Sequence, residues 1–286
     1  MSPRTNAIRT GIQRGWTEFI QSLRSPQDQG FYIFTSLAVL GYLFFNRNNE
    51  VEGAGQSLSF PTFAMPSILG GLVAFGMIIG PAYSLAMERE DGTLLRAKAV
   101  PNGVLGHVTG HVVGNTLSII PSFAVILIPG MLLFPGLMSN GLEGWFTVLW
   151  VTVLGILATL PIGMIIGSLV PGVQKVGTWG MLPFLVLAGI SGIFFPIQAL
   201  AGWVQVVAQV FPLYWLGLGM RSAFLPDAAA ALEIGGSWRP GWTVLVLSLW
   251  AAAGLAIAPR VLRRMARRQS GSEVEAAREQ ALQWVR

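Results

Sequence analysis

The sequence predicts an all-α polytopic membrane protein, and three observations support this fold class. Of the 286 residues, 53% are hydrophobic and 11% are charged, whereas about 25% of the residues in soluble domains are charged. The charged residues are clustered, so that long uncharged stretches lie between them. Several of these stretches approach the length of about 20 apolar residues that a membrane-spanning helix needs. A chain with so few charges could not cover the surface of a soluble fold.

The uncharged stretches predict six transmembrane helices within a membrane domain of residues 30–260. The expected spans are 30–46, 60–87, 104–134, 145–170, 179–195 and 241–260. The second and third spans are long and contain Pro66, Pro81, Pro121 and Pro129. Proline removes a helical hydrogen bond, so we expect kinks or broken ends in these two spans. The first apolar run has no cleavage site after it, so we expect it to remain as a span.

The apolar segment 196–225 is expected to form re-entrant helices after the fifth span. Pro196 and Pro212 bracket only 15 residues, which is too short to cross a bilayer. Apolar backbone of this kind enters the membrane only where protein surrounds it. Trp203 and Arg221 belong to the same segment.

The N-terminal segment, residues 1–29, is expected to form a cytoplasmic amphipathic helix at the membrane interface. Its apolar residues follow helical spacing on one face, namely Ile8, Ile12, Trp16, Phe19, Ile20 and Leu23. Basic and amide side chains lie mostly off that face, and Pro26 ends the pattern. This composition is typical of a helix in the headgroup region, and an amphipathic helix packed on a partner is a compatible alternative.

The distribution of basic residues predicts that both termini are cytoplasmic. Segments 1–29, 88–103, 171–178 and 260–286 hold 15 of the 18 basic residues, and such residues are enriched on the cytoplasmic side. Residues 261–286, which follow Arg260 at the membrane edge, are expected to form a basic tail. Because the basic residues flank the apolar runs, the net charge of +5 indicates membrane anchoring and no nucleic-acid partner.

The sequence lacks the motifs of an ATP-binding subunit. A phosphate-binding loop needs Gly-Lys followed by Ser or Thr, but Lys98 follows Ala97 and Lys175 follows Gln174. If ATP drives this protein, another polypeptide supplies the ATPase. The chain also has no cysteine, which excludes disulfides and thiolate metal sites.

By this topology all 13 acidic residues lie in loops or tails. Carriers coupled to protons or sodium commonly use carboxylates inside the membrane, so their expected absence weakens a secondary-carrier interpretation. It does not exclude a carrier or channel that coordinates ions through backbone carbonyls at broken helices.

Two further patterns suggest chemistry without establishing it. His107 and His111 are one helical turn apart, which suits a metal pair, but no Asp, Glu or Cys lies in reach in the same span. Hydrogen bonding between helices is the favoured interpretation, with no metal. The stretch Gly189–Phe194 looks like the Gly-x-Ser-Gly stretch of rhomboid intramembrane proteases. No histidine follows His111 to act as base for Ser191, and a serine without a base is a weak nucleophile.

Small residues repeat every four positions in three of the expected spans. The repeats are Gly76 and Gly80; Gly106, Gly110 and Gly114; and Gly155, Thr159, Gly163 and Gly167. Such spacing lets helix backbones approach closely in lipid, so these stripes predict helix contacts.

The loop 88–103 between the second and third spans contains the most informative pattern. Acidic residues Glu88, Glu90 and Asp91 precede Gly92, and Thr93 is expected to cap a short helix that Pro101 ends. A short charged helix at this position is a docking surface, and the alternative is an ordinary solvated loop.

This loop resembles the signature loop of type-2 ABC exporter permeases, such as the daunorubicin-resistance, nodulation and polysaccharide exporters. The matching residues are Glu-x-Glu-x-Gly-Thr-Leu at 88–94, followed by Pro101. A second match is Ser191–Pro196, then Leu200, Trp203, Phe211–Leu213 and Arg221. Ala201 departs from the family, which often has proline there. The resemblance covers nearly the whole chain.

The resemblance implies an ATP-driven exporter permease of the bacterial plasma (inner) membrane that moves an amphiphilic drug, antibiotic or lipid. A second permease chain would form a homodimer or heterodimer with this one. ABC ATPase subunits on separate chains would bind ATP and magnesium, so this chain would hold no cofactor and no catalytic residue. The coupling residues would be Glu88, Glu90, Asp91, Gly92, Thr93, Leu94, Arg96 and Pro101. The N-terminal helix would contact the same subunits.

Overall fold

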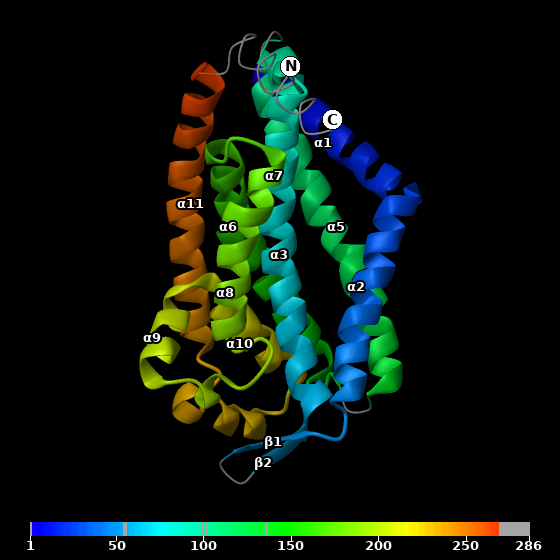
Figure 1. Cartoon of the computed structure of the whole chain (residues 1–286), viewed down its shortest axis with the longest axis vertical. Coiled ribbons are helices and arrows are strands. Elements are labelled where there is room, and N and C mark those ends of the chain that lie inside the picture. The colour runs from blue at the N-terminus through cyan, green and yellow to red at the C-terminus, as the bar shows by residue number, and fades with distance from the viewer. Residues whose placement is uncertain (1, 54–55, 99, 101, 135–136, 269–286) are drawn as a thin grey trace.

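The computed structural model describes residues 2–53, 56–98, 100, 102–134 and 137–268. The chain forms a bundle of long helices that run between two ends of the molecule, as Figure 1 shows. The first half contains α1 (Pro3–Arg24), α2 (Pro26–Phe45), β1 (Glu50–Gly53), β2 (Gln56–Ser59), α3 (Phe60–Glu90), α4 (Thr93–Lys98) and α5 (Gly103–Leu133). The second half contains α6 (Gly141–Leu169), α7 (Val173–Val176), the π-helix η1 (Gly177–Met181), α8 (Leu182–Ile190), η2 (Ile197–Ala199), α9 (Gly202–Val210), α10 (Pro212–Phe224), η3 (Asp227–Leu232), η4 (Ile234–Gly236) and α11 (Pro240–Arg268).

The helix lengths and compositions confirm the all-α polytopic membrane class. Within the described residues, five helices are long and apolar enough to cross a membrane: α3, α5, α6, Val173–Ile190 and Pro240–Met265. The expected first span corresponds to α2, which has 20 residues but starts with the polar residues Gln27, Asp28 and Gln29. It does not reach the apolar composition of the other five.

The segment after α8 is broken, as the prolines predicted. Helices α9 and α10 meet at an angle of 91°, which makes them either one broken span or a re-entrant pair. Pro212 is the first residue of α10 and is buried, whereas Trp203 in α9 is exposed. Pro196 precedes η2 in the turn that follows α8.

Proline does not break the two long helices. α3 contains Pro66 and Pro81, and α5 contains Pro121 and Pro129, yet each is continuous over 31 residues. The expectation of broken ends is therefore wrong for these helices. Neighbouring helices surround α3 along most of its length, and such packing tolerates the hydrogen bonds that proline removes.

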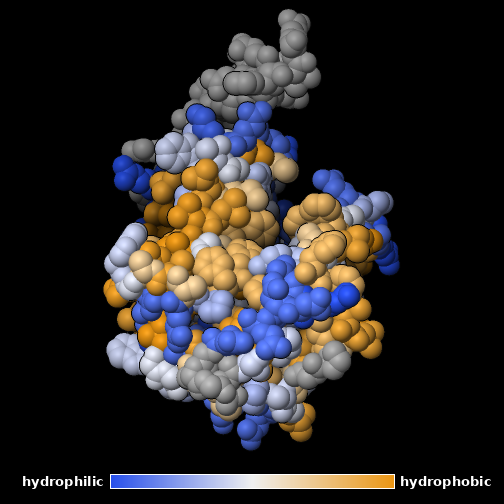
Figure 2. Space-filling view, turned by 60° about the horizontal axis from the view of Figure 1, so that its bottom comes forward, coloured by the Kyte–Doolittle hydropathy of each residue, from blue (hydrophilic) through white to orange (hydrophobic). Residues whose placement is uncertain are grey.

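Helix α3 is the core of the bundle. It contacts α5, α6 and α10, while α6 also packs against α11. Most α3 side chains are buried, including Leu69, Val73 and Met77 in the main hydrophobic core. At one end, β1 and β2 form an antiparallel hairpin with Val51 opposite Leu58, and Val51 packs with Phe63 of α3 and Leu225. Figure 2 shows hydrophilic side chains gathered on this hairpin end, with hydrophobic ones around them.

Helix α1 lies across the opposite end, where α11 also ends (Figure 1). Its glycines Gly11 and Gly15 are buried against α5. A Cβ atom at Gly15 would lie 2.5 Å from the carbonyl oxygen of Gly110, and one at Gly11 would lie 2.3 Å from that of Gly106. The stripe on α5 therefore packs backbone to backbone against α1, as small-residue stripes do in membranes.

The expected apolar face of α1 is mostly turned outward. Ile8, Ile12, Trp16 and Leu23 are exposed, Ile20 is half-buried and Phe19 is buried. Because glycines rather than the large apolar residues contact α5, most of the apolar side chains remain exposed.

The remaining glycine stripes behave differently from one another. A Cβ at Gly163 would lie 2.4 Å from the carbonyl oxygen of Ile78, and one at Gly167 would lie 2.7 Å from that of Ala82, so this part of α6 packs closely on α3. A Cβ at Gly76 on α3, in contrast, would meet no atom within 4 Å. The prediction of a helix contact at Gly76 is therefore wrong, and the position borders open space.

We predict that Gly15→Ala lowers the thermal unfolding midpoint of the detergent-solubilised protein, because the added methyl would force α1 away from α5. Overpacking costs about 1–3 kcal/mol. The control is Gly41→Ala in α2, where the new Cβ meets no atom within 4 Å. Equal midpoints for the two variants would contradict the close α1–α5 contact.

Candidate functional site

The last turn of α3 carries three consecutive charged residues that bind three different neighbours. We call Glu88, Arg89 and Glu90, with the groups that they contact, the α3 hub. Glu88 is 7% exposed and faces α5 and α1, Arg89 reaches the end of α6, and Glu90 reaches the start of α7. One short segment therefore connects the helix ends around it.

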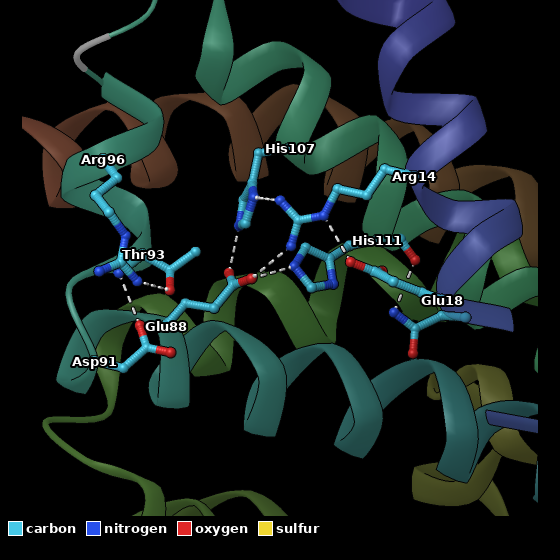
Figure 3. Close-up of polar contacts among 9 residues, drawn as sticks. Arg14, Glu18, Glu88, Asp91, Thr93, Arg96, His107 and His111 are labelled. Atoms are coloured by element: carbon cyan, nitrogen blue, oxygen red, sulfur yellow. Dashed lines mark hydrogen bonds and ion pairs between the residues drawn. The ribbon is translucent and has the colours of Figure 1, made fainter. Parts of the chain in front are cut away.

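Glu88 accepts a hydrogen bond on each carboxylate oxygen from a histidine of α5. Oε2 lies 2.5 Å from Nε2 of His107, and Oε1 lies 2.6 Å from Nε2 of His111. Figure 3 shows both rings turned toward this carboxylate. The i, i+4 spacing of the histidines places them on one helix face, and α5 packs against α3 at this level.

Arg14 of α1 completes the cluster around Glu88. Its Nη1 lies 2.5 Å from Nδ1 of His107, its Nη2 lies 3.7 Å from Oε1 of Glu88, and its Nε donates to Glu18 over 2.6 Å. A guanidinium has only donors, so Nδ1 of His107 must accept. His107 is therefore the neutral tautomer that carries its proton on Nε2 and donates it to Glu88.

Glu88, His107 and His111 present ligand atoms that lie within 4.8 Å of one another, a spacing that could hold a metal ion. A metal on Nε2 of His107 would leave the proton on Nδ1, where it would face the N–H of Arg14. Metal ligation by His107 and its hydrogen bond with Arg14 therefore exclude each other. The observed geometry is that of a hydrogen-bonded cluster, in which the histidines bridge two helices as the sequence predicted.

Arg89 and Glu90 cap the ends of two further helices. Nη1 of Arg89 donates to the carbonyl oxygens of Gly167, Ser168 and Val170, the last over 2.8 Å. The final carbonyls of a helix lack partners within it, and a cation there also complements the helix dipole. Oε1 of Glu90 accepts the backbone N–H of Val173 over 2.8 Å at the start of α7.

The hub leads directly into α4. Gly92 adopts φ +75°, a left-handed conformation that favours glycine, and so turns the chain between α3 and α4. Oδ1 of Asp91 accepts the N–H of Thr93 over 2.7 Å, and the Thr93 hydroxyl accepts from Arg96 over 2.9 Å. Asp91 therefore caps α4, and the expectation that Thr93 would cap it is wrong.

The structure changes the expected roles of the acidic residues. Glu88 and Glu90 belong to α3, and Glu143 lies in the first turn of α6, so the expectation that every acid lies outside the spans is wrong. Glu88 is buried and Glu90 half-buried, whereas Asp91 and Arg96 are exposed. Pro101 and the side chain of Leu94 lie outside the described residues.

A second buried polar cluster lies toward the hairpin end. Arg221 of α10, expected in the re-entrant segment 196–225, is 1% exposed and bonds both carboxylate oxygens of Glu233, at 2.5 and 3.1 Å. Its Nη1 also donates to Ser67 of α3 over 2.6 Å and to the carbonyl of Gly192 over 3.2 Å. A buried charge needs such partners, and these contacts fix α10 to α3 and to the turn after α8.

Ser191 shows no arrangement for nucleophilic catalysis. Its hydroxyl is buried and donates to the carbonyl of Ala188 over 2.9 Å. Both histidines of the chain contact Glu88 instead, and a serine nucleophile requires a neighbouring base.

Sequence reasoning selected Glu88 and Glu90 and expected the two histidines to bond between helices. It did not identify Arg14 or Glu233, nor Glu88 as the partner of the histidines. The i, i+4 histidine pair near the end of a span was the available signal for the first cluster. For the second, a lone arginine in an apolar segment already requires a buried partner.

These features define a class: a polytopic helical membrane domain in which a short helix is joined to a buried polar hub. The chain belongs to the ABC-2 family of transporter proteins, because the model of that family, described as "ABC-2 family transporter protein", matches residues 20–258. The family comprises the membrane permease subunits of ABC transporters, which partner with ABC ATPase subunits. A search of curated proteins finds no match.

We predict that Glu88→Ala lowers stability by about 1–3 kcal/mol, because it leaves the buried Nε2–H donor of His107 without its acceptor. The measurement is the thermal unfolding midpoint in detergent. Glu18→Ala is the control, because Glu18 makes a half-exposed pair with Arg14, and such pairs contribute about 0–1 kcal/mol. Similar losses in both variants would contradict the central role of Glu88.

Proposed function

We propose that this chain is the permease subunit of an ATP-driven exporter that moves an amphiphilic drug, antibiotic or lipid out of the cytoplasm or inner leaflet. The observation that carries the proposal is the family match over residues 20–258, together with the hub at the base of α4. The chain would work as half of a permease dimer in the bacterial plasma membrane.

The orientation follows from charge. The α4 end of the bundle carries most of the basic residues outside the apolar helices, which is typical of a cytoplasmic face. Both termini and α4 then lie in the cytoplasm, and the β-hairpin lies outside. The outward-turned face of α1, with Ile8, Ile12 and Trp16, suits the inner headgroup region.

Helix α4 is the proposed coupling helix. Asp91 and Arg96 expose their side chains beside it, so they offer the charged contacts that an ATPase subunit would bind. A displacement of α4 by the ATPase would move the end of α3, to which Asp91 joins it. The contacts of Glu88 would then move α1 and α5, and those of Arg89 and Glu90 would move α6 and α7.

A secondary carrier or channel is the second candidate. The buried carboxylate of Glu88 removes one argument against it, because an acid does lie between packed helices. Glu88 is already bonded by two histidines, however, and the family match favours ATP-driven transport.

The deciding experiment is purification from gently solubilised native membranes, followed by reconstitution. We expect an ABC ATPase subunit to copurify and transport to require ATP and magnesium. Transport that follows an ion gradient and ignores ATP would support the carrier instead, and absence of both the ATPase and ATP-driven transport would refute the permease assignment.

We predict that Glu90→Ala reduces ATP-driven transport while the amount of inserted protein stays the same, because α3 would lose its contact with α7. Glu143→Ala is the matched control, since Glu143 is exposed at the hairpin end of α6. Transport in proteoliposomes is the readout. Transport by Glu90→Ala equal to that of the control would remove Glu90 from the coupling path.

Docking of the ATPase is expected to weaken with salt, because exposed charge pairs are screened over a Debye length of about 8 Å at 0.15 M ionic strength. We predict that Asp91→Asn or Arg96→Gln reduces both the affinity for the ATPase subunit and its dependence on salt. Binding of the detergent-solubilised subunits across a salt series measures both quantities. Salt-independent binding would argue against a charged docking surface at α4.

A further inference from the structure

Two adjoining chambers lie along α3 and α5. The larger, of about 740 Å³, lies among α2, α3, α5 and α8, and the smaller, of about 400 Å³, lies among α1, α3, α5 and the start of α4. Ser22, Asn115 and Ser118 line both, so the two chambers share a wall. The smaller chamber lies at the hub, and the larger extends from it toward the hairpin end.

The larger chamber is mainly apolar. Six phenylalanines line it: Phe31, Phe34, Phe75, Phe123, Phe184 and Phe194. Gly76 borders it as well, and a Cβ there would meet no atom within 4 Å. Its volume falls in the range of small-molecule sites, roughly 300–1,000 Å³. The chamber therefore suits the apolar body of a ligand.

The charged groups around the two chambers are mostly acidic. Glu18, Glu88 and Asp91 line the smaller chamber, together with Arg14 and His111. The donors of Arg14 already face Glu18, His107 and Glu88. Asp28 lies in the first turn of α2 and lines the larger chamber. Within the described part of the chain its backbone N–H, and not its carboxylate, bonds a side chain, the hydroxyl of Ser25.

The shared wall offers hydrogen-bond acceptors. The Asn115 amide and the Ser118 hydroxyl donate to the carbonyl oxygens of His111 and Gly114, over 2.8 and 2.9 Å. Ser122, which lines the larger chamber, donates to the carbonyl of Ser118 over 2.8 Å. The Asn115 carbonyl oxygen and the serine lone pairs remain as acceptors for a ligand.

We propose that the two chambers form one binding site for a cationic amphiphile whose protonated amine lies at the shared wall. The acceptors at the wall and the carboxylate of Asp28 select a positive group with N–H donors, and the phenylalanine-lined chamber takes the apolar body. The aromatic faces also attract a cation that lies over them. The role of this site in export rests on the proposed function, but binding itself requires no ATPase.

The test is equilibrium binding to the full chain in nanodiscs of phosphatidylcholine, which carries no net charge. The probes are radiolabelled dodecylamine, dodecanol and dodecyl sulfonate, and empty nanodiscs correct for partition into lipid. We expect saturable binding of dodecylamine, at least about tenfold tighter than dodecanol, as one charge contact in a partly buried site allows. Dodecyl sulfonate should bind more weakly than dodecanol.

Two substitutions separate the contribution of the amine headgroup to binding from that of the dodecyl chain. Asp28→Asn should weaken dodecylamine binding by about tenfold and leave dodecanol unchanged. Asp227→Asn is the control, because Asp227 is an exposed helix-start aspartate at the hairpin end. Gly76→Phe should fill the larger chamber and weaken dodecylamine and dodecanol alike, and the open space at Gly76 lets this variant fold.

The results distinguish this proposal from the proposed function. Equal binding of the amine and the sulfonate, an unaltered amine preference in Asp28→Asn, or no saturable binding of any probe would each overturn the cationic site. Saturable, Asp28-dependent amine binding would support the site. If the same preparation then showed no ATP-driven transport with its ATPase, the exporter assignment alone would fail.

Discussion

The buried carboxylate of Glu88 is the interaction on which the α4 end of the molecule depends. A carboxylate out of water costs several kcal/mol unless partners compensate it, so the chain must bring donors to it from elsewhere. It does so from two helices: His107 and His111 of α5 each donate to one oxygen, and Arg14 of α1 bonds His107 from the other side. Satisfying one charge therefore fixes the positions of three helices.

The hub and the glycine contacts act on the same helices by different means. Gly11 and Gly15 let α1 approach the backbone of α5, which brings Arg14 within reach of the histidines. The polar cluster in turn sets the register at which the two helices meet, because hydrogen bonds are directional and glycine contacts are not. The glycine contacts let α1 and α5 approach closely, and the hydrogen-bonded cluster fixes the register at which they pack.

The sequence predicted the helical membrane class and the amphipathic first helix, because apolar length and helical periodicity are properties of a single segment. It could not predict that Arg14 meets His107, 93 residues away, because that contact depends on how helices pack. The same limit explains the misplaced cap of α4, where the carboxylate of Asp91 accepts the N–H of Thr93, and the burial of Glu88 one residue beyond the expected span. Gly76 and Gly163 follow similar sequence spacing, yet only the tertiary arrangement determines that one faces a chamber and the other a helix.

The glycine contact between α1 and α5 also determines an order of assembly during synthesis. Gly11 and Gly15 leave the ribosome long before Gly106 and Gly110, so α1 must wait while α2 and α3 are made and inserted. Most of its large apolar side chains are exposed and are not needed for the contact with α5. The helix is therefore divided into a glycine face, which meets its partner only after α5 has been made, and an exposed apolar face, which does not depend on that contact.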